Sequence, residues 1–166
     1  MAGTEVGVAP AERLMLRHSV ATLAYRAAKA MADTPPGFAE FRVGPSTRTP
    51  GQILAHLGDL MDWVLRCAQG EPVYSESAPA TWEHGVKRFF DAVGRFDALL
   101  ASNAPLAFSS EQLFQGAIAD ALTHVGQISL LRRLAGSPVR GESYFRAEIV
   151  IGRVGREQSA KRVEFD

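Results

Sequence analysis

The sequence predicts a single all-α domain, a four-helix bundle that is followed by an extended C-terminal tail. Four segments repeat apolar residues at the spacing of one helix face, two of them open with a capping box, and this pattern stops after Gly141. A chain of 166 residues fits one domain whose core needs no disulfide. We expect residues 1–141 to form the bundle and residues 142–166 to form the tail of the same domain.

The first two expected helices are defined by their apolar stripes and by the residues at their ends. The first runs from about Ala11 to Ala32 and stops before a Pro-Pro-Gly breaker. The second opens at Thr49-Pro50-Gly51-Gln52, where threonine suits the N-cap, proline suits the first helical position and glutamine completes a capping box. Gly70 ends this helix.

The third and fourth expected helices follow the same logic. The third runs from about Thr81 to Ser102, with a stripe of valine, phenylalanine and leucine. The fourth opens with a second capping box, Ser109-Ser110-Glu111-Gln112, and runs to Ala135, where Gly136 ends it.

The connection between the second and third helices predicts the topology. Gly70 to Ala80 can extend to roughly 36 Å, and each helix is expected to be about 30–37 Å long. The connection can therefore run the length of the bundle, whereas a hairpin needs far fewer residues. We expect an up-down-down-up order with one long crossover.

Composition excludes several classes of partner. Lys+Arg and Asp+Glu both number 18, which argues against nucleic acid or an anionic membrane. Cys67 is the single cysteine, so the chain forms no internal disulfide and a reducing compartment fits best. No apolar run is long enough to span a bilayer. Met1 to Pro10 lacks the pattern of a signal peptide, and we expect a cytoplasmic protein.

Polar residues interrupt the apolar stripe of the fourth helix. That stripe consists of Leu113, Ala117, Asp120, His124, Gln127 and Leu131. Asp120 and His124 are one turn apart, so their side chains point the same way. A carboxylate inside a bundle needs a partner or a metal ion. In the expected topology, His56 on the second helix lies at a similar height, and Tyr25 lies near enough to line a pocket.

Two histidines and one carboxylate form a common divalent-metal set that leaves positions open for water or substrate. Spacing alone leaves a second interpretation open, in which Asp120 and His124 only hydrogen-bond to each other and His56 is an unrelated core histidine. His18 falls at least a turn below the expected site. Arg48, Arg132 and Arg133 are available to an anionic cofactor, although solvated surface charge is the simpler interpretation.

Two stretches resemble the DinB/YfiT-like superfamily of metal-dependent four-helix-bundle enzymes. Thr49 to Trp63 resembles the family's second helix, in which the metal histidine is followed by an aromatic residue. Ala119 to Gln127 resembles the fourth-helix motif His-x-x-x-His-x-Gly-Gln, with Asp120 in place of the first histidine. The resemblance implies one divalent metal on His56, Asp120 and His124. We expect Tyr25, Trp63 and Gln127 to line the pocket or to support the ligands.

The resemblance also implies a function. Relatives often hold zinc or nickel and are usually homodimers, and the mixed nitrogen and oxygen set here also suits iron or manganese. Some transfer a low-molecular-weight thiol to a small-molecule substrate. We therefore expect a metal-bound thiol or water as the nucleophile, because a cation stabilises the anionic form of either. The alternatives are a non-enzymatic, stress-related metal- or ligand-binding bundle and a purely structural bundle.

The tail supplies a further reason to expect a homodimer. It carries apolar residues that need cover from the bundle or from a second subunit. These residues are Tyr144, Phe145, Ile149, Val150 and Ile151.

Overall fold

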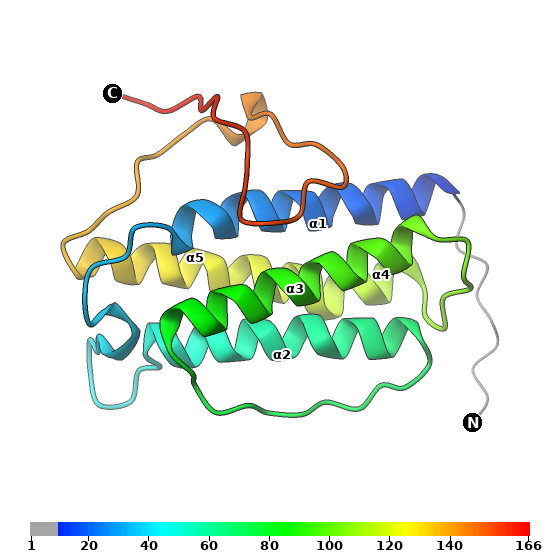
Figure 1. The fold of residues 1–166 in the computed structure, drawn as a ribbon, viewed down its shortest axis with the longest axis horizontal. Helices are drawn as coiled ribbons and strands as arrows, with labels where there is room; N and C mark the ends of the chain where they lie inside the picture. The colour runs from blue at the N-terminus through cyan, green and yellow to red at the C-terminus, as the bar shows by residue number, and fades with distance from the viewer. Residues whose placement is uncertain (1–9) are drawn as a thin grey trace.

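The computed structural model describes residues 10–166, and within that range the chain is all-α, as the sequence predicts (Figure 1). Only one isolated β-bridge, between Glu142 and Glu164, is present in these residues. The helical elements in chain order are α1 (Pro10–Met31), η1 (Phe38–Glu40), α2 (Pro50–Ala68), α3 (Trp82–Ala101), α4 (Ser110–Leu113), the π-helical η2 (Phe114–Ile118), α5 (Ala119–Leu134) and η3 (Tyr144–Arg146). The signal-peptide expectation falls on residues 1–9, outside the described range.

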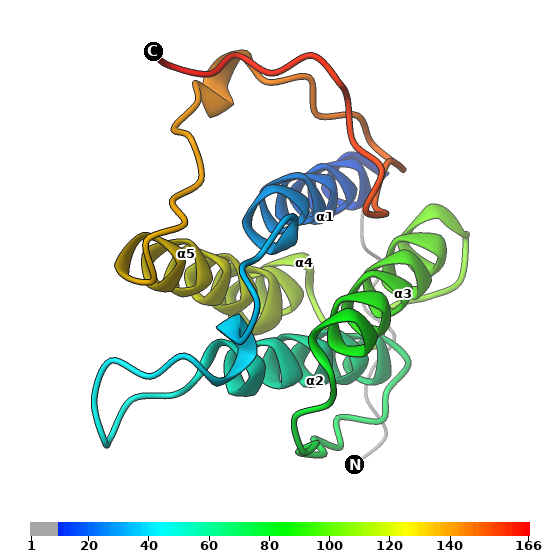
Figure 2. The same cartoon turned by 60° about the vertical axis from the view of Figure 1, so that its left-hand side comes forward.

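Four long helical segments pack side by side around one core. Helix α1 contacts α3 and α5, and helix α2 contacts the same two helices, so α1 and α2 occupy opposite corners (Figure 2). The connection between α2 and α3 runs back along the outer side of α2, so that α3 starts at the same end of the molecule as α2 (Figure 1). None of the described helices is long and apolar enough to cross a membrane.

Helix starts follow the capping signals in the sequence. The Thr49 hydroxyl accepts from the Gln52 backbone N–H at 3.2 Å, and the Gln52 side chain accepts from the Thr49 N–H at 2.9 Å. Ser109 and Gln112 form the same reciprocal pair at the start of α4. Both predicted capping boxes are confirmed, and they fix where α2 and the α4–α5 segment enter the bundle.

Arg132 corrects one expectation from the sequence. We expected solvated surface charge, but Arg132 is only 5% exposed. Its guanidinium donates to the carbonyls of Ala30, Ala32 and Asp33 at the end of α1, and to Ser137. The last carbonyls of a helix lack intrahelical donors, and Arg132 supplies them. It therefore ties α5 to the end of α1 and is not available to a cofactor.

The C-terminal segment, residues 142–166, lies across α1 (Figure 1). Lys29 of α1 pairs with Glu142 at 3.3 Å and with Glu164 at 2.8 Å. The Tyr25 hydroxyl donates to Glu142 at 2.9 Å, and the Arg162 guanidinium lies 4.4 Å from the centre of the Tyr25 ring. Both ends of the segment are thus fastened to the same face of α1.

Candidate metal centre

The three residues that the sequence singles out come together between α2 and α5. His56 Nε2 lies 3.6 Å from Asp120 Oδ2, and His124 Nδ1 lies 3.3 Å from Asp120 Oδ1. The two imidazole rings are 4.6 Å apart between centroids. One potential ligand atom from each residue falls within 4.8 Å of the others. The predicted juxtaposition is therefore present in the structure.

A π-helical turn, which the sequence analysis missed, positions the two residues of α5. A π-helical turn holds about one residue more than an α-helical turn, so the core face shifts here from Leu113 and Ala117 to Ile118. It then continues at normal spacing through Ala121, Val125 and Ile128. The stripe expected from Leu113 to Leu131 is therefore right for its apolar members, since Leu113, Ala117 and Leu131 are buried, and wrong for its polar ones. Its polar members lie beside the core face, where they meet α2.

Hydrogen bonds orient both imidazoles. His124 Nδ1 lies 2.9 Å from the backbone carbonyl oxygen of Asp120. A carbonyl only accepts, so Nδ1 carries the proton and the neutral ring presents its lone pair on Nε2. His56 Nδ1 lies 2.8 Å from the Tyr74 hydroxyl, which leaves Nε2 directed at Asp120. Such bonds to the far nitrogen are the usual support of a metal-binding histidine.

The three side chains could hold one divalent cation if the ligand atoms, which lie within 4.8 Å of one another, moved closer together around it. Ligand atoms around a tetrahedral ion with bonds of about 2.0–2.1 Å are roughly 3.3–3.4 Å apart, close to the 3.6 Å between His56 and Asp120. The side chains of His56 and His124 are 22% and 12% exposed, whereas Asp120 is 41% exposed. Two neutral imidazoles and one carboxylate carry a net negative charge, which favours a cation.

The electrostatics of His56 argue against a simple ion pair. Burial lowers the pKa of His56 below its usual 6.5, repulsion from the protonated form of His124 and from Arg48 lowers it further, and Asp120 opposes these effects. A neutral imidazole forms no ion pair with a carboxylate. It is, however, the form that binds a metal ion.

This pKa shift gives a first prediction. In the metal-free protein, His56 should titrate below 6.5, because burial disfavours the imidazolium. His56 should therefore be available to a metal at mildly acidic pH, where an ordinary histidine is half protonated. An NMR pH titration of the imidazole resonances measures this pKa, with the His56→Ala protein used to assign the His56 resonances. A His56 pKa above 6.5 would show that Asp120 dominates and would restore the ion-pair interpretation.

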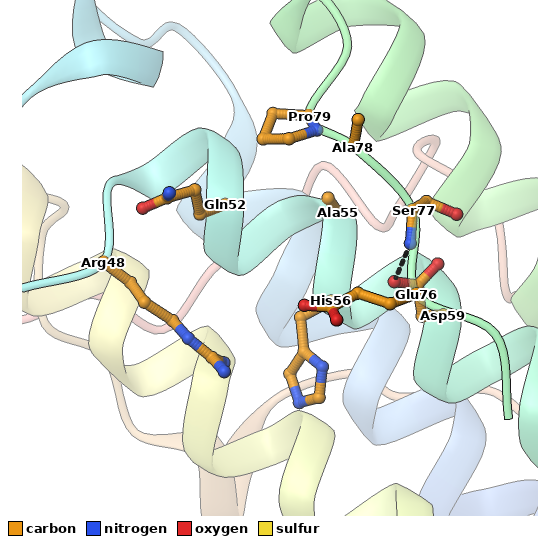
Figure 3. Close-up of a pocket in the computed structure, with 9 residues that line it drawn as sticks. All are labelled: Arg48, Gln52, Ala55, His56, Asp59, Glu76, Ser77, Ala78 and Pro79. Carbon is orange, nitrogen blue, oxygen red and sulfur yellow. Dashed lines mark hydrogen bonds between the residues drawn. The ribbon is translucent and has the colours of Figure 1, made fainter.

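A cavity of about 350 Å³ adjoins His56 (Figure 3). Arg48 and Gln52 line it beside the start of α2, and Glu76 and Ser77 line it from the crossover. This volume is at the lower end of the range of small-molecule sites, about 300–1,000 Å³. The cavity gives a small molecule access to the imidazole.

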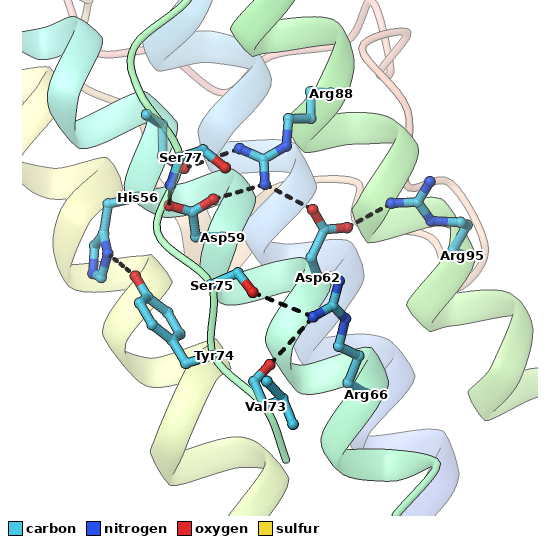
Figure 4. Close-up of polar contacts among 11 residues, drawn as sticks. His56, Asp59, Asp62, Arg66, Val73, Tyr74, Ser75, Ser77, Arg88 and Arg95 are labelled. Carbon is cyan, nitrogen blue, oxygen red and sulfur yellow. Dashed lines mark hydrogen bonds and ion pairs between the residues drawn. The ribbon is translucent and has the colours of Figure 1, made fainter. Parts of the chain in front are cut away.

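A polar network holds the crossover against α2 and α3 (Figure 4). Asp59, only 2% exposed, accepts from the Ser77 backbone N–H at 2.9 Å and from Arg88 at 2.7 Å. Arg88 also donates to Asp62, which accepts from Arg95. Because Ser77 is anchored in this way, the nearby Tyr74 is held where it reaches His56.

The remaining predicted pocket residues lie in different places. Trp63 is half-buried and packs edge-on against Tyr74, with ring centroids 6.2 Å apart. Gln127 is exposed. Tyr25 is fully buried under the C-terminal segment, where Glu142 accepts its hydroxyl proton, and it does not line the cavity beside His56. Trp63 therefore contacts Tyr74, the hydrogen-bond partner of His56.

Comparison of the chain with protein-family models, with curated proteins and with solved structures gives no match. The case for a function therefore rests on the geometry of the site.

Tyr74 gives a second prediction. Replacing Tyr74 by phenylalanine removes the hydrogen bond to His56 Nδ1 but keeps the ring that packs on Trp63. Loss of such a supporting contact costs about 10–100-fold in metal affinity, and we expect that loss for zinc by calorimetric titration. Tyr144→Phe is the matched control, since Tyr144 packs against Tyr25 and Arg26 beside the C-terminal segment. Equal zinc affinity in Tyr74→Phe and the parent would show that Tyr74 does not orient the ligand.

Proposed function

We propose that the chain is a metal-dependent enzyme of the DinB/YfiT-like type. In this proposal an up-down-down-up bundle, with the long crossover between α2 and α3, holds one divalent metal ion on His56, Asp120 and His124. Zinc, nickel, iron and manganese all suit this donor set. The observation that carries the proposal is the convergence of three ligand groups beside a cavity open to small molecules.

The location of the two resembling stretches supports this proposal. Thr49 to Trp63 spans most of α2, and Ala119 to Gln127 forms the first half of α5. These helices contact each other, so the two stretches face one another across the site. The departure from the family motif, Asp120, lies between the two histidines and is within 3.6 Å of both.

The residues of the chain each have a defined part in the proposed reaction. A bound divalent cation lowers the pKa of a thiol or water and so supplies a nucleophile at neutral pH. Burial favours the neutral form of His56, and the hydrogen bond between its Nδ1 and the Tyr74 hydroxyl leaves Nε2 for the metal ion. His124 is fixed by the Asp120 carbonyl. The Asp120 carboxylate offsets part of the cation's charge.

The cavity favours an enzyme over a non-enzymatic binder. A stress-related metal- or ligand-binding bundle needs the same three ligands but no space for a substrate beside them. Here the space adjoins His56 directly, and its wall is held in place by the buried Asp59. An enzyme that acts on a small thiol therefore accounts for more of the structure.

Cobalt-substituted protein tests the thiol activity. A small thiol at millimolar concentration should bind as the thiolate and change the visible spectrum of the cobalt ion. The His124→Ala protein, treated in the same way, is the control. An unchanged spectrum with every physiological thiol tried would overturn thiol activation.

We also propose a homodimer that buries part of the C-terminal segment. Phe145 is fully exposed at 100%, and Val150 and Ile151 are also exposed. Large apolar side chains that stay exposed are candidates for burial in an assembly. Sedimentation or light scattering at micromolar concentration should give twice the chain mass, and Phe145→Ser should weaken the association. A monomer mass for the parent protein would contradict the proposal.

The proposal includes a cytoplasmic protein whose partner is a small molecule. The single cysteine, Cys67, is a buried free thiol, which fits a reducing compartment. The equal numbers of acidic and basic residues give no electrostatic basis for binding nucleic acid or a membrane surface.

A further inference from the structure

We propose that the cavity beside His56 binds a compact zwitterion of the amino-acid type, with its carboxylate on Arg48 and its ammonium group on Glu76. This inference rests on the proposed function, because it names the substrate class of the same site. It specifies which end of the ligand each charged residue holds.

The first support is the set of charges that line the cavity. Asp59 lines it too, but Arg88 and the Ser77 N–H already engage its carboxylate. Among residues 10–166, Arg48 and Glu76 have neither an ion-pair partner nor a side-chain hydrogen bond, and no ion pair joins them to each other. One positive and one negative group therefore remain for a ligand.

The second support is that both charges lie close to the site. Arg48 comes from the segment before α2 and Glu76 from the crossover, and both line the cavity with His56 (Figure 3). The two charges thus share one small space with His56 itself.

The third support is the size and lining of the cavity. Its volume of about 350 Å³ accommodates a small amino acid or its derivative. Ala55, Ala78 and Pro79 supply short apolar walls, which favour a small side chain over a long or charged one. A ligand with only negative charge would meet Glu76 without compensation, whereas a zwitterion satisfies both ends. A cysteine-like ligand would leave its thiol for the metal centre.

The test uses zinc-loaded protein and four small probes in calorimetric titrations. S-methyl-L-cysteine has both charges but no free thiol, and L-cysteine has both charges and a thiol. Cysteamine lacks the carboxylate, and 3-mercaptopropionate lacks the amine. Comparison of these probes separates recognition of the two charges from binding of the thiol.

Two charge-neutral variants then assign the ends of the ligand. Arg48→Gln should weaken S-methyl-L-cysteine and 3-mercaptopropionate by about tenfold or more and leave cysteamine unchanged, since each carboxylate loses a charge-assisted hydrogen bond. Glu76→Gln should weaken S-methyl-L-cysteine and cysteamine and leave 3-mercaptopropionate unchanged. Arg133→Gln and Glu71→Gln, exposed charges outside the cavity, are the matched controls.

The outcomes separate this inference from the proposed function. If S-methyl-L-cysteine binds with the expected charge dependence but thiols leave the cobalt spectrum unchanged, the zwitterion site stands and thiol activation falls. If thiols change the spectrum but neither variant discriminates among the probes, the zwitterion site is overturned. Failure of S-methyl-L-cysteine to bind the parent protein at millimolar concentration overturns it as well.

Discussion

The His124→Ala and His56→Ala proteins are expected to lose the divalent metal and to keep their helices. Each substitution removes one of three ligands, and two remaining side chains do not hold a divalent ion at micromolar concentration. Both imidazoles lie at the edge of the core, which consists of apolar residues such as Leu57 and Ile118. The fold should therefore survive while the site fails. Metal content after dialysis and far-ultraviolet circular dichroism measure the two properties.

His18→Ala is the matched control for these variants, because His18 is exposed on α1. It should retain about one metal ion per chain. Zinc should also raise the melting temperature of the parent and of this control, but not of the site variants, since only a protein with the site gains stability by mass action. Unfolding of both site variants without added denaturant would show that the histidines serve the fold instead.

Asp120→Ala is expected to weaken zinc binding strongly, and Asp120→His is expected to restore most of it. Position 120 lies one turn before His124, so either side chain points toward the same place. Histidine reaches further than aspartate and is neutral, so the restored site carries one negative charge less. A water or thiol bound there should be more acidic than in the parent.

Zinc titrations of the parent and of both Asp120 variants distinguish two roles for this residue. If Asp120 is a direct ligand, zinc affinity falls strongly in Asp120→Ala and recovers in Asp120→His. If the Asp120 carboxylate only orients His124, zinc affinity falls by about 10–100-fold in Asp120→Ala. Equal affinity in the parent and in Asp120→Ala would exclude Asp120 from the site.

The fold class was predictable from the sequence because the capping residues and the apolar stripes indicate the same helices. Thr49 and Ser109 stand where their side chains cap the helices, and the apolar stripes that follow them are buried. The same capping signal gave the height of His56 on α2, and hence its approach to His124. Both features depend on spacing along one helix, which a sequence displays directly.

The π-helical turn was beyond sequence reasoning of this kind. Phe114 to Ile118 contains no proline or other residue that marks an extra residue per turn. The turn rotates Asp120 and His124 relative to Leu113. The sequence predicted that both side chains lie in the middle of the buried stripe, but in the structure they lie beside it. Asp120 and His124 still point to the same place because their relative spacing lies wholly after the turn.

The contacts of the crossover and the tail were also not predictable. Tyr74 lies in a segment without periodicity, and it reaches His56 only because the distant Asp59 and Arg88 hold Ser77. Tyr25 was expected near the metal level from its position along the first helix, but that position does not say which face of α1 the C-terminal segment covers. In both cases the contact depends on the path of a segment without helical periodicity, the crossover for Tyr74 and the C-terminal segment for Tyr25.

The most direct test of the metal centre is the metal content of protein purified without a histidine tag. Elemental analysis of the parent and of the His56→Ala, His124→Ala double variant compares the same chain with and without both imidazoles. We expect about one equivalent of a divalent transition metal in the parent and almost none in the double variant. A parent that carries no metal, and that takes up none from a zinc-containing buffer, would contradict the metal centre and the function proposed for it.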